Sequence, residues 1–316
     1  MATGSFSSQV KIELARKVPE KNCCCLAEFS ALLRAGGTLG IGTGKQLSFY
    51  ISTDNAAVAR HVFRLGKQLY NWPIELRVRR QDRLKKQNRY RVRLIIPESK
   101  ENELQQLGII KSRRVVEGIR SALVKRQCCR RAYLRGVFLG CGSVSNPEAG
   151  YHLELVLSSE VYALGIVSLL NRMGLQARIN QRKHMHVVYL KEAEQIASLL
   201  RLIGAHGALL RLEDVRAMKE VRNQVNRLVN CDTANLEKAV STGLRQARSI
   251  QFILDKVGID YLQDPLRQVA ELRLEYPEAS LKELGDLMEP KLGKSGVNHR
   301  LRRLEEIAEQ LGKNNM

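Results

Sequence analysis

Seven cysteines are the residues of this chain that could ligate a metal ion or undergo redox chemistry. They are Cys23, Cys24, Cys25, Cys128, Cys129, Cys141 and Cys231. An odd, clustered set argues against a disulfide framework, and the sequence contains no Cys-x-x-Cys pair. Adjacent cysteines on a helix point to different faces, so such a pair does not converge on one ion. We therefore expect no metal and no cofactor, and we interpret the thiols as buried or redox-sensitive.

A basic segment, residues 77–93, is suited to binding phosphate groups. Nine of its residues are Lys or Arg, and Asp82 is the acid among them. Those nine are Arg77, Arg79, Arg80, Arg83, Lys85, Lys86, Arg89, Arg91 and Arg93. Strand alternation in a hairpin places Arg77, Arg79, Arg89, Arg91 and Arg93 on one face. We predict that this face contacts the DNA backbone; a solvated face that only keeps the protein soluble is the alternative.

The whole chain shares this basic character. Its 316 residues include 52 Lys and Arg against 32 Asp and Glu, a formal net charge of +20. Each Lys or Arg set against a phosphate releases a condensed counterion, so the excess favours double-stranded DNA as the partner. No apolar run reaches the ~18 residues that span a bilayer, and residues 1–9 lack a signal-peptide pattern. We expect a cytoplasmic, nucleoid-associated protein of two domains with no membrane partner.

The C-terminal region has the helix signals of a helix-turn-helix. Asp264 as N-cap and Pro265 as first helical residue predict a helix that ends at Tyr276. Ser280 and Glu283 have the spacing of a capping box, which predicts a short helix to Met288. A turn and Ser295 then precede a helix over residues 296–311. The expected core residues are Leu284, Leu287, Leu292, Val297, Leu301, Leu304 and Ile307.

This region also holds the candidate base-reading residues. They are Ser280, Lys282, Lys291, Lys294, Ser295, Asn298, His299, Arg300, Arg302 and Arg303. Asn298 can pair with adenine, and Arg300 or Arg302 can pair with guanine, through two hydrogen bonds each. The N-terminal half of the last helix would therefore enter the major groove. The alternative is a small helical hairpin that only packs on the scaffold. Residues 221–255 are either a connecting helical arm or the start of this domain.

The elements before residue 212 repeat. In each half, a short motif helix behind a Cys-Cys pair is followed by an alternating strand and a helix of 3.6-residue period. The strands are 47–53 and 153–159, and the helices are 54–70 and 160–173. Leu164, Val167 and Leu170 should lie on the apolar face of the second helix. The later elements are strands 74–80 and 89–95 and helix 102–107, then strands 176–181 and 186–190 and helix 192–203.

The two motif helices carry small residues at helical spacing. Ala31 and Ala35 in the first, and Gly136 and Gly140 in the second, lie four residues apart and hence on one face. Glycine costs a helix about 1 kcal/mol per residue, so its presence indicates close backbone packing. We predict that these helices form the seam between the two halves.

Residues 132–143, Ala-Tyr-Leu-Arg-Gly-Val-Phe-Leu-Gly-Cys-Gly-Ser, with the related residues 29–38, resemble the motif of LAGLIDADG homing endonucleases. Nearly the full chain resembles the WhiA family of bacterial regulators, and residues 128–143, which start with the pair Cys128 and Cys129, are the most specific match. The resemblance implies an α+β fold, in which a duplicated αββαββα domain precedes an all-α helix-turn-helix domain. The first domain would cover residues 1–220, with halves at about 20–110 and 128–212. The second would cover 221–316, with the helix-turn-helix at about 279–311.

The resemblance also indicates that the catalytic acids are missing. In active LAGLIDADG nucleases an acid beside the last glycine of each motif holds the divalent cation that phosphodiester cleavage requires. Gly36 and Cys141 occupy those positions here, and neither supplies a hard oxygen ligand. Glu28 and Glu148 are near in sequence but outside the motif positions. We therefore expect DNA binding without catalysis.

Membership of this family implies a sequence-specific transcription regulator of cell division and chromosome segregation, with a sporulation role in some lineages. It also implies a WhiB-type iron–sulfur partner in actinobacteria, or RNA polymerase. Two other hypotheses stay open. One is an architectural DNA-binding protein with little sequence preference, and the other is a residual nuclease that uses acids outside the motif.

Overall fold

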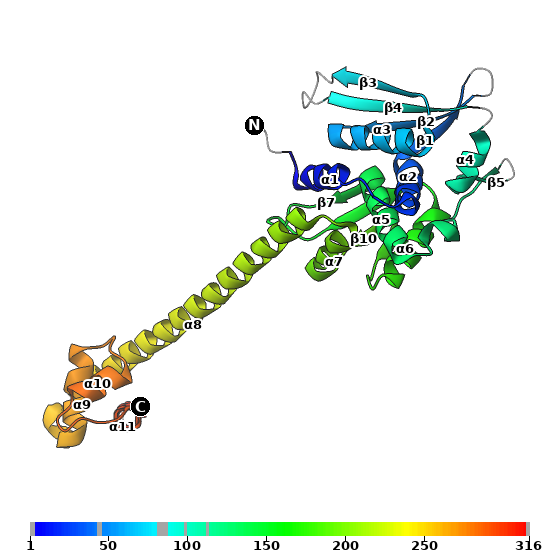
Figure 1. Cartoon of the computed structure of the whole chain (residues 1–316). Coiled ribbons are helices and arrows are strands. Elements are labelled where there is room, and N and C mark those ends of the chain that lie inside the picture. Colours follow the sequence, from blue (N-terminus) through cyan, green and yellow to red (C-terminus); the bar gives the residue numbers. More distant parts are fainter. Residues whose placement is uncertain (1–3, 43–45, 81–87, 98–99, 112–113, 314–316) are drawn as a thin grey trace. The chain divides into compact units, whose positions relative to one another are not determined.

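The computed structural model describes residues 4–42, 46–80, 88–97, 100–111 and 114–313, and the chain divides into two compact units, residues 1–218 and 219–316. The first unit mixes helices with sheets, and the described residues of the second are helical with turns (Figure 1). The expected α+β class is thus confirmed. None of the described helices is long and apolar enough to cross a membrane.

Apart from the first helix, the first half of unit 1 follows the predicted element order. It contains α1 (Phe6–Arg16), α2 (Asn22–Gly36), β1 (Gly37–Ile41), β2 (Leu47–Thr53), α3 (Ala56–Tyr70), β3 (Ile74–Arg80), β4 (Asn88–Ile96) and α4 (Glu101–Gln106). The strands form one antiparallel sheet of order β1-β2-β4-β3. The sheet buries Phe49, Ile51, Val92 and Leu94 on the face that carries the core, together with the apolar side of α3.

The second half repeats this order after a short connection. The connection contains β5 (Ile110–Lys111), β6 (Arg114–Val115) and the 3-10 helix Ser121–Val124. The repeat contains α5 (Gln127–Cys141), β7 (Gly142–Val144), β8 (Leu153–Leu157), α6 (Glu160–Arg172), β9 (Arg178–Arg182), β10 (Met185–Leu190) and α7 (Ala193–Ile203). Its sheet order, β7-β8-β10-β9, matches that of the first sheet. The internal duplication is therefore confirmed.

The motif helices α2 and α5 pack against each other along their length, as the small residues predicted. A Cβ at Gly140 would lie 2.9 Å from the backbone nitrogen of Gly36 and 3.1 Å from the Cβ of Ala35. Any larger side chain at this position would push the helices apart. Both helices join one core, because Leu134, Val137 and Phe138 of α5 are buried in the same cluster as Phe29 and Leu32 of α2.

Two features of unit 1 differ from the sequence-based expectations. Helix α1 was not anticipated, although Phe6, Val10 and Leu14 have helical spacing and are buried in the core. In α6 the prediction for Leu164 was wrong, since half of this residue is exposed. The buried face of α6 instead consists of Tyr162, Ala163, Ile166, Leu169 and Leu170. Within this face the hydroxyl of Tyr133 donates to that of Tyr162 at 3.1 Å.

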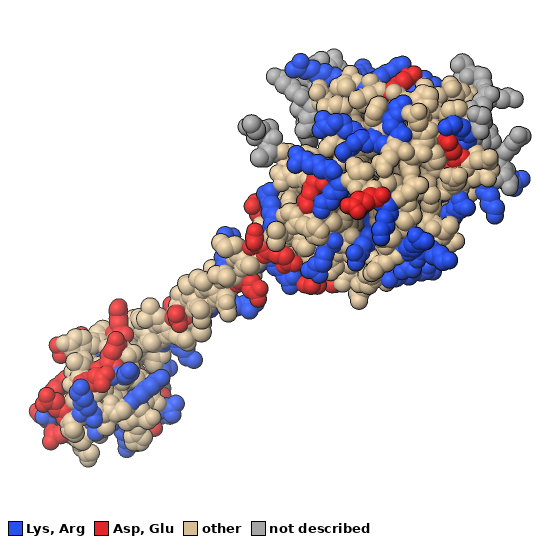
Figure 2. All heavy atoms as spheres, in the orientation of Figure 1, with Lys and Arg blue, Asp and Glu red and all other residues tan. Residues whose placement is uncertain are grey.

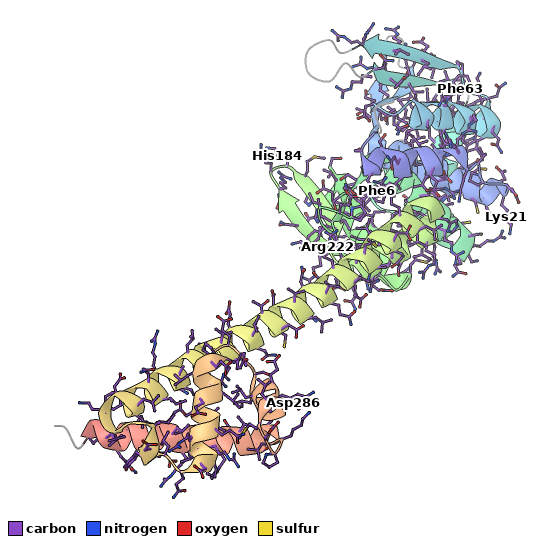
Figure 3. The ribbon with its side chains drawn as sticks, turned by 90° about the vertical axis from the view of Figure 1, so that its left-hand side faces the viewer. Phe6, Lys21, Phe63, His184, Arg222 and Asp286 are labelled. Atoms are coloured by element: carbon purple, nitrogen blue, oxygen red, sulfur yellow. The ribbon has the colours of Figure 1, made fainter. Side chains whose placement is uncertain are left out.

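Helix α8 (His206–Val257) resolves the two alternatives for the segment after residue 212, because it belongs to both units. Its first turns bury Ala208 and Leu212 in the core of unit 1, whereas Ile250 and Ile253 join a second core in unit 2. The side chains of residues 220–238 are exposed, including Arg222, which is labelled in Figure 3. One long helix thus begins in the first unit and ends in the second.

One 3-10 helix and three α-helices follow α8 in unit 2. They are the 3-10 helix Ile259–Tyr261, α9 (Asp264–Glu275), α10 (Leu281–Leu287) and α11 (Lys294–Lys313). The capping box of Ser280 and Glu283 is confirmed: the serine side chain accepts from the Glu283 amide, and the glutamate accepts from the Ser280 amide at 2.7 Å. Leu284, Val297, Leu301 and Leu304 are buried between the helices, as expected.

Three details of unit 2 correct the predictions. Asp264 is the first residue of α9 rather than its N-cap, which is Gln263. Ser295 lies inside α11, because that helix already begins at Lys294. Leu287 is half exposed, and Met288 takes the buried position instead.

Candidate nucleic-acid interface

The first motif position has no space for a carboxylate. Gly36 is the last residue of α2, and a Cβ there would lie 2.8 Å from Cα and 2.9 Å from the carbonyl oxygen of Gly140. Carbon atoms do not approach backbone this closely, so even a methyl group would displace the seam. The first motif position therefore has neither an acidic side chain nor the space for one.

The second motif position holds a neutral thiol. Cys141 is the last residue of α5, and its Sγ lies 3.4 Å from the carbonyl oxygen of Val137. Burial raises the pKa of this thiol to about 12, although the nearby ammonium of Lys11 opposes the shift. Burial also lowers the pKa of Lys11 itself, although the carboxylate of Asp54 opposes the shift. Helix α1 thus places a lysine beside the position where a metal-binding nuclease needs an anion.

The two glutamates near the motifs are engaged elsewhere. Glu28 is fully buried in α2, where Oε1 lies 2.7 Å from Nε2 of His61 and Oε2 accepts from Nε of Arg135 at 2.8 Å. A second hydrogen bond joins the Arg135 guanidinium to the same oxygen. Glu148 is exposed in a loop and contacts Asn146. Glu28 is thus engaged by His61 and Arg135, and Glu148 lies in a loop outside the motif helices, so neither joins the two motif ends.

The basic face of the first sheet has the geometry that strand alternation predicts. In the register of β3 and β4, Arg77 lies directly opposite Arg91, and Arg79 lies opposite Arg89. Arg93 lies opposite Glu75, and the ion pair between them spans 3.7 Å. All five arginines therefore lie on one face of the sheet, the face away from Val92 and Leu94. Of the four other basic residues of this segment, Arg80 is exposed at the end of β3, and Arg83, Lys85 and Lys86 lie outside the described residues.

Four of those arginines form two like-charged pairs on an exposed surface. Arg77, Arg79, Arg89 and Arg91 are all exposed, and Glu75 forms ion pairs with Arg77 and Arg93. Like charges directly opposite each other destabilise an antiparallel pair by a few tenths of a kcal/mol or more. A polyanion laid along the face would remove that repulsion and release its own counterions.

The matching face of the second sheet is less basic. The register there places Arg178 opposite Tyr189, Asn180 opposite Val187 and Arg182 opposite Met185. Glu154 lies on the same face, opposite Tyr189 across the next strand pair. The two sheets thus offer unequal surfaces to a phosphate backbone.

Helix α11 presents a polar face opposite its buried residues. Val297, Leu301 and Leu304 face the core, so Ser295, His299 and Arg302 lie on the outside, with Asn298 half-buried beside them. Lys294 at the helix start is exposed too, as are Lys282 and Lys291 before it. These are the residues that could enter a groove of DNA without disturbing the core.

Three of the predicted contact residues have partners within unit 2. Arg300 is half-buried and donates to the carbonyl oxygen of Pro265 in α9 at 3.3 Å. Arg303 forms an ion pair with Glu306 at 2.8 Å, and the Ser280 hydroxyl serves the capping box. Sequence reasoning overlooked Arg273, a buried residue that donates to the carbonyl oxygens of Tyr276, Pro277 and Ala279. That residue holds the turn between α9 and α10. Asp286, which is labelled in Figure 3, is exposed near the end of α10.

The formal charge is distributed unevenly. Residues 219–316 contain 16 Lys and Arg against 15 Asp and Glu, so almost all of the net charge of +20 lies in residues 1–218. On the face drawn in Figure 2, basic side chains predominate over scattered acidic ones on unit 1, whereas the two signs are mixed on unit 2. Unit 1 therefore supplies the electrostatic attraction to a polyanion, and the polar face of α11 lies in a nearly neutral unit.

The cysteines are arranged differently from the prediction. Cys23 and Cys24 in the first turn of α2, and Cys128 and Cys129 in the first turn of α5, bring their sulfur atoms within 4.8 Å of one another. Adjacent cysteines on one helix do diverge. Two such pairs on the facing helices α2 and α5 can nevertheless surround a common point. The expectation that these thiols cannot converge on one ion was therefore wrong.

Family models match three segments of this chain. Residues 22–110 match the WhiA N-terminal LAGLIDADG-like domain, residues 130–222 the WhiA LAGLIDADG-like domain, and residues 225–308 the WhiA C-terminal HTH domain. Together they cover most of the sequence. The chain belongs to the WhiA family. Its degenerate motif helices and C-terminal helix-turn-helix are thus those of the WhiA domains.

Relatives of known name match over nearly the whole length. A protein of Heliobacterium modesticaldum is 52% identical over 309 residues, with 96% of each chain covered. One from Desulfitobacterium hafniense is 51% identical over 308 residues, covering 97% of this chain and 96% of the relative. Both are named probable cell division protein WhiA.

A solved structure has the same fold. The crystal structure of full-length DUF199/WhiA from Thermatoga maritima is 26% identical, with a TM-score of 0.61, and covers 97% of this chain and 99% of that one. An N-terminal LAGLIDADG domain of DUF199/WhiA matches 63% of this chain at 23% identity, with a TM-score of 0.52. The second likeness concerns fold alone.

Proposed function

We propose that this WhiA-family protein is a sequence-specific DNA-binding transcription regulator that acts in cell division and does not cleave DNA. The observation that carries the proposal is the outer face of α11, where Ser295, His299 and Arg302 lie opposite the buried residues of a helix-turn-helix unit and the half-buried Asn298 borders them. A helix with this arrangement can lie in the major groove while its apolar face keeps the unit folded.

Specificity would come from base edges in the groove. An asparagine amide can form two hydrogen bonds with adenine, and an arginine guanidinium can form two with guanine. Asn298 and Arg302 are the best placed to do so. Arg300 is the weaker candidate, because its guanidinium already donates to Pro265.

Affinity would come mainly from unit 1. The face formed by Arg77, Arg79, Arg89, Arg91 and Arg93 carries repulsion that a phosphate backbone relieves. This term is independent of sequence, so it favours binding to any DNA and leaves discrimination to α11.

The absence of cleavage is supported by the two motif ends. Gly36 has no room for a side chain, and Cys141 is a neutral thiol beside Lys11. Metal-assisted phosphodiester cleavage needs carboxylates that hold the cation at this place. The residual-nuclease hypothesis therefore has little support in the geometry.

The biological role follows from the relatives. Proteins about half identical over the full length are named probable cell division protein WhiA, and we extend that role to this chain. Action in chromosome segregation, residence at the nucleoid, and an RNA polymerase or WhiB-type partner are implied by the family resemblance and stay predictions.

One observation favours the second candidate, an architectural protein with little sequence preference. Nearly all of the net positive charge lies in unit 1, whose contacts would be to phosphates. An architectural protein would bind every fragment through that surface, and α11 would then add only further backbone contacts.

Selection from fragmented genomic DNA at physiological salt with Mg²⁺ separates the two functions. The full chain is compared with a variant that combines Asn298→Ala and Arg302→Ala. A regulator enriches a small set of uncut fragments, and the variant loses that enrichment while it still retains DNA. Indiscriminate retention by both proteins would support the architectural function and overturn the proposal.

A further inference from the structure

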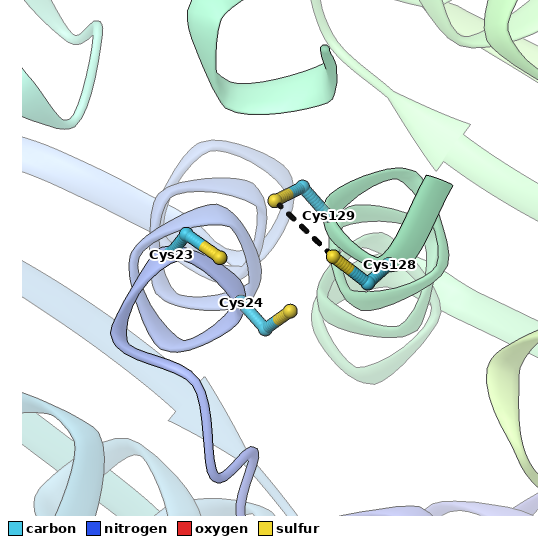
Figure 4. A group of neighbouring side chains, drawn as sticks. All are labelled: Cys23, Cys24, Cys128 and Cys129. Atoms are coloured by element: carbon cyan, nitrogen blue, oxygen red, sulfur yellow. Dashed lines mark hydrogen bonds between the residues drawn. The ribbon is translucent and has the colours of Figure 1, made fainter. Parts of the chain in front are cut away.

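Four cysteines converge where the motif helices begin. Cys23 and Cys24 come from the first turn of α2, Cys128 and Cys129 come from the first turn of α5, and the four Sγ atoms lie within 4.8 Å of one another. Figure 4 shows their sulfur atoms directed into the space between the two helices. These segments are about a hundred residues apart in the chain, so the tertiary fold, not local sequence, brings them together.

Helix geometry explains the convergence. Neighbouring residues on a helix differ by about 100° in direction, so a Cys-Cys pair can straddle the line that faces a partner helix. Two such pairs on closely packed helices then enclose a common space. The third cysteine of the first run behaves differently, because Cys25 is fully buried and its Sγ contacts the carbonyl oxygen of Pro19 at 3.0 Å.

The spacing suits a single ion with four sulfur ligands. A Zn–S bond of about 2.3 Å in a tetrahedron places the sulfur atoms about 3.8 Å apart. The Sγ atoms of Cys128 and Cys129 are 3.9 Å apart, and the rest need to move by at most about 1 Å. The ligands of an iron–sulfur cluster stand farther apart, because the inorganic core separates them.

Positively polarised groups lie close to the four sulfur atoms. Both pairs occupy helix N-termini, where the first amides lack intrahelical acceptors and the helix dipole stabilises negative charge. Neither Lys21 nor Arg126, at the two N-cap positions, uses its side chain as a cap. A guanidinium nitrogen of Arg126 lies 4.0 Å from Sγ of Cys23. These groups would balance part of the negative charge that four thiolates leave on a divalent ion.

An entry path exists as well. Cys24 and Cys129 are buried, with 7% and 3% of their surface exposed, whereas Cys23 and Cys128 are half-buried and open toward solvent. The cluster lies about 18 Å along the helices from Gly36 and Cys141, since twelve residues of helix separate Cys24 from Gly36. It is therefore independent of the degenerate motif positions.

We propose that Cys23, Cys24, Cys128 and Cys129 form a tetrathiolate site for one soft divalent metal ion, with zinc as the usual ion of such structural sites. Binding displaces the thiol protons and joins the start of α2 to the start of α5. The bound ion links the two halves of unit 1 and stabilises their packing. The site takes no part in DNA contact.

Metal titration of the full chain tests this directly. The reduced, metal-free protein is titrated with Co²⁺ and then with Zn²⁺. One equivalent of Co²⁺ should produce the visible and thiolate-to-metal absorption of tetrahedral sulfur ligation, and Zn²⁺ should displace it. Thermal unfolding is followed in parallel, and Zn²⁺ should raise the Tm of unit 1 while a chelator reverses the effect.

Variants separate ligation from packing. Cys23→Ser and Cys128→Ser alter half-buried residues, so folding can be verified by circular dichroism, and each should weaken metal affinity at least tenfold and abolish the absorption. Cys25→Ser and Cys231→Ser change cysteines outside the cluster and should keep one equivalent and full affinity.

Three results would overturn the proposal. The first is a folded, fully reduced protein that binds no Co²⁺ and whose Tm does not change when Zn²⁺ is added. The four cysteines would then be ordinary core residues. The second is disulfides among these cysteines in protein purified without reductant and with no capacity for metal after reduction. The third is iron with inorganic sulfide in protein isolated without oxygen.

Discussion

A methyl group on Gly136 would overlap the backbone carbonyl oxygen of Glu28, so the two motif helices are as close as their backbones permit. The same methyl group would lie 2.9 Å from the Cβ of Ala31. This contact sets the distance between the two halves of unit 1, and every feature along the seam depends on it.

Gly136→Ala should therefore destabilise unit 1. Alanine improves helix propensity by about 1 kcal/mol, but overpacking against a rigid backbone costs about 1–3 kcal/mol or more, so the clash dominates. Chemical denaturation should show a lower midpoint. Gly165→Ala is the matched control in α6, where a Cβ meets only the movable side chain of Ile119 at 3.2 Å, and its effect should be small. Equal midpoints for the two variants would contradict the account of the seam.

Arg135→Ala should lower the free energy of unfolding even more than Gly136→Ala does. The Arg135 guanidinium is bound to the fully buried carboxylate of Glu28, and removing one partner of a buried ion pair typically costs about 3–5 kcal/mol. Arg131→Ala removes an exposed arginine from the same helix and should change stability by less than about 0.5 kcal/mol. Unfolding free energies from urea titration measure both. A loss for Arg135→Ala no larger than that of the control would show that Glu28 does not depend on the pair.

Neutralising Arg89, Arg91 and Arg93 to glutamine should weaken binding to all DNA sequences alike. Each lost phosphate contact lowers the slope of log K against log salt by about 0.9, so the triple variant should lose up to about 2.7. Arg178→Gln with Arg182→Gln, on the less basic sheet, should lose less. An unchanged slope in the triple variant would mean that this face is merely solvated.

Supercoiled plasmid should stay intact with the wild-type protein in Mg²⁺ or Mn²⁺. Cys141→Asp adds one carboxylate but should not create cleavage, because Gly36 cannot accept a second. Gel analysis of nicked and linear forms checks both proteins. Nicking by the wild type that persists through a further purification step would refute the non-catalytic assignment.

The sequence predicted the parts of this structure that depend on local pattern. The strand 74–80 has the bounds of β3, and the face shared by Arg77, Arg79, Arg89, Arg91 and Arg93 follows from strand alternation alone. The seam followed from small residues at four-residue spacing. Such features arise from the periodicity of side chains, which can be read from the sequence.

Features that depend on contacts between distant segments were missed. The four cysteines converge only because α2 and α5 pack face to face, and Lys11 approaches Cys141 only because α1 folds back on unit 1. Arg300 was predicted as a base reader from its place on α11, but its bond to Pro265 requires knowledge of how α9 packs. Periodicity predicts which residues share one face of a helix, but it does not predict which other element that face contacts.

The most direct test of the central claim is the ratio of dissociation constants for a selected genomic fragment and a random fragment, measured for Asn298→Ala and Arg302→Ala. Each substitution should cost about 1–3 kcal/mol on the selected fragment and little on random DNA, which lowers the ratio. Lys313→Ala, which removes a charge from the far end of α11, should leave the ratio unchanged. If both substitutions weaken selected and random DNA equally, α11 does not read sequence, and the regulator assignment fails.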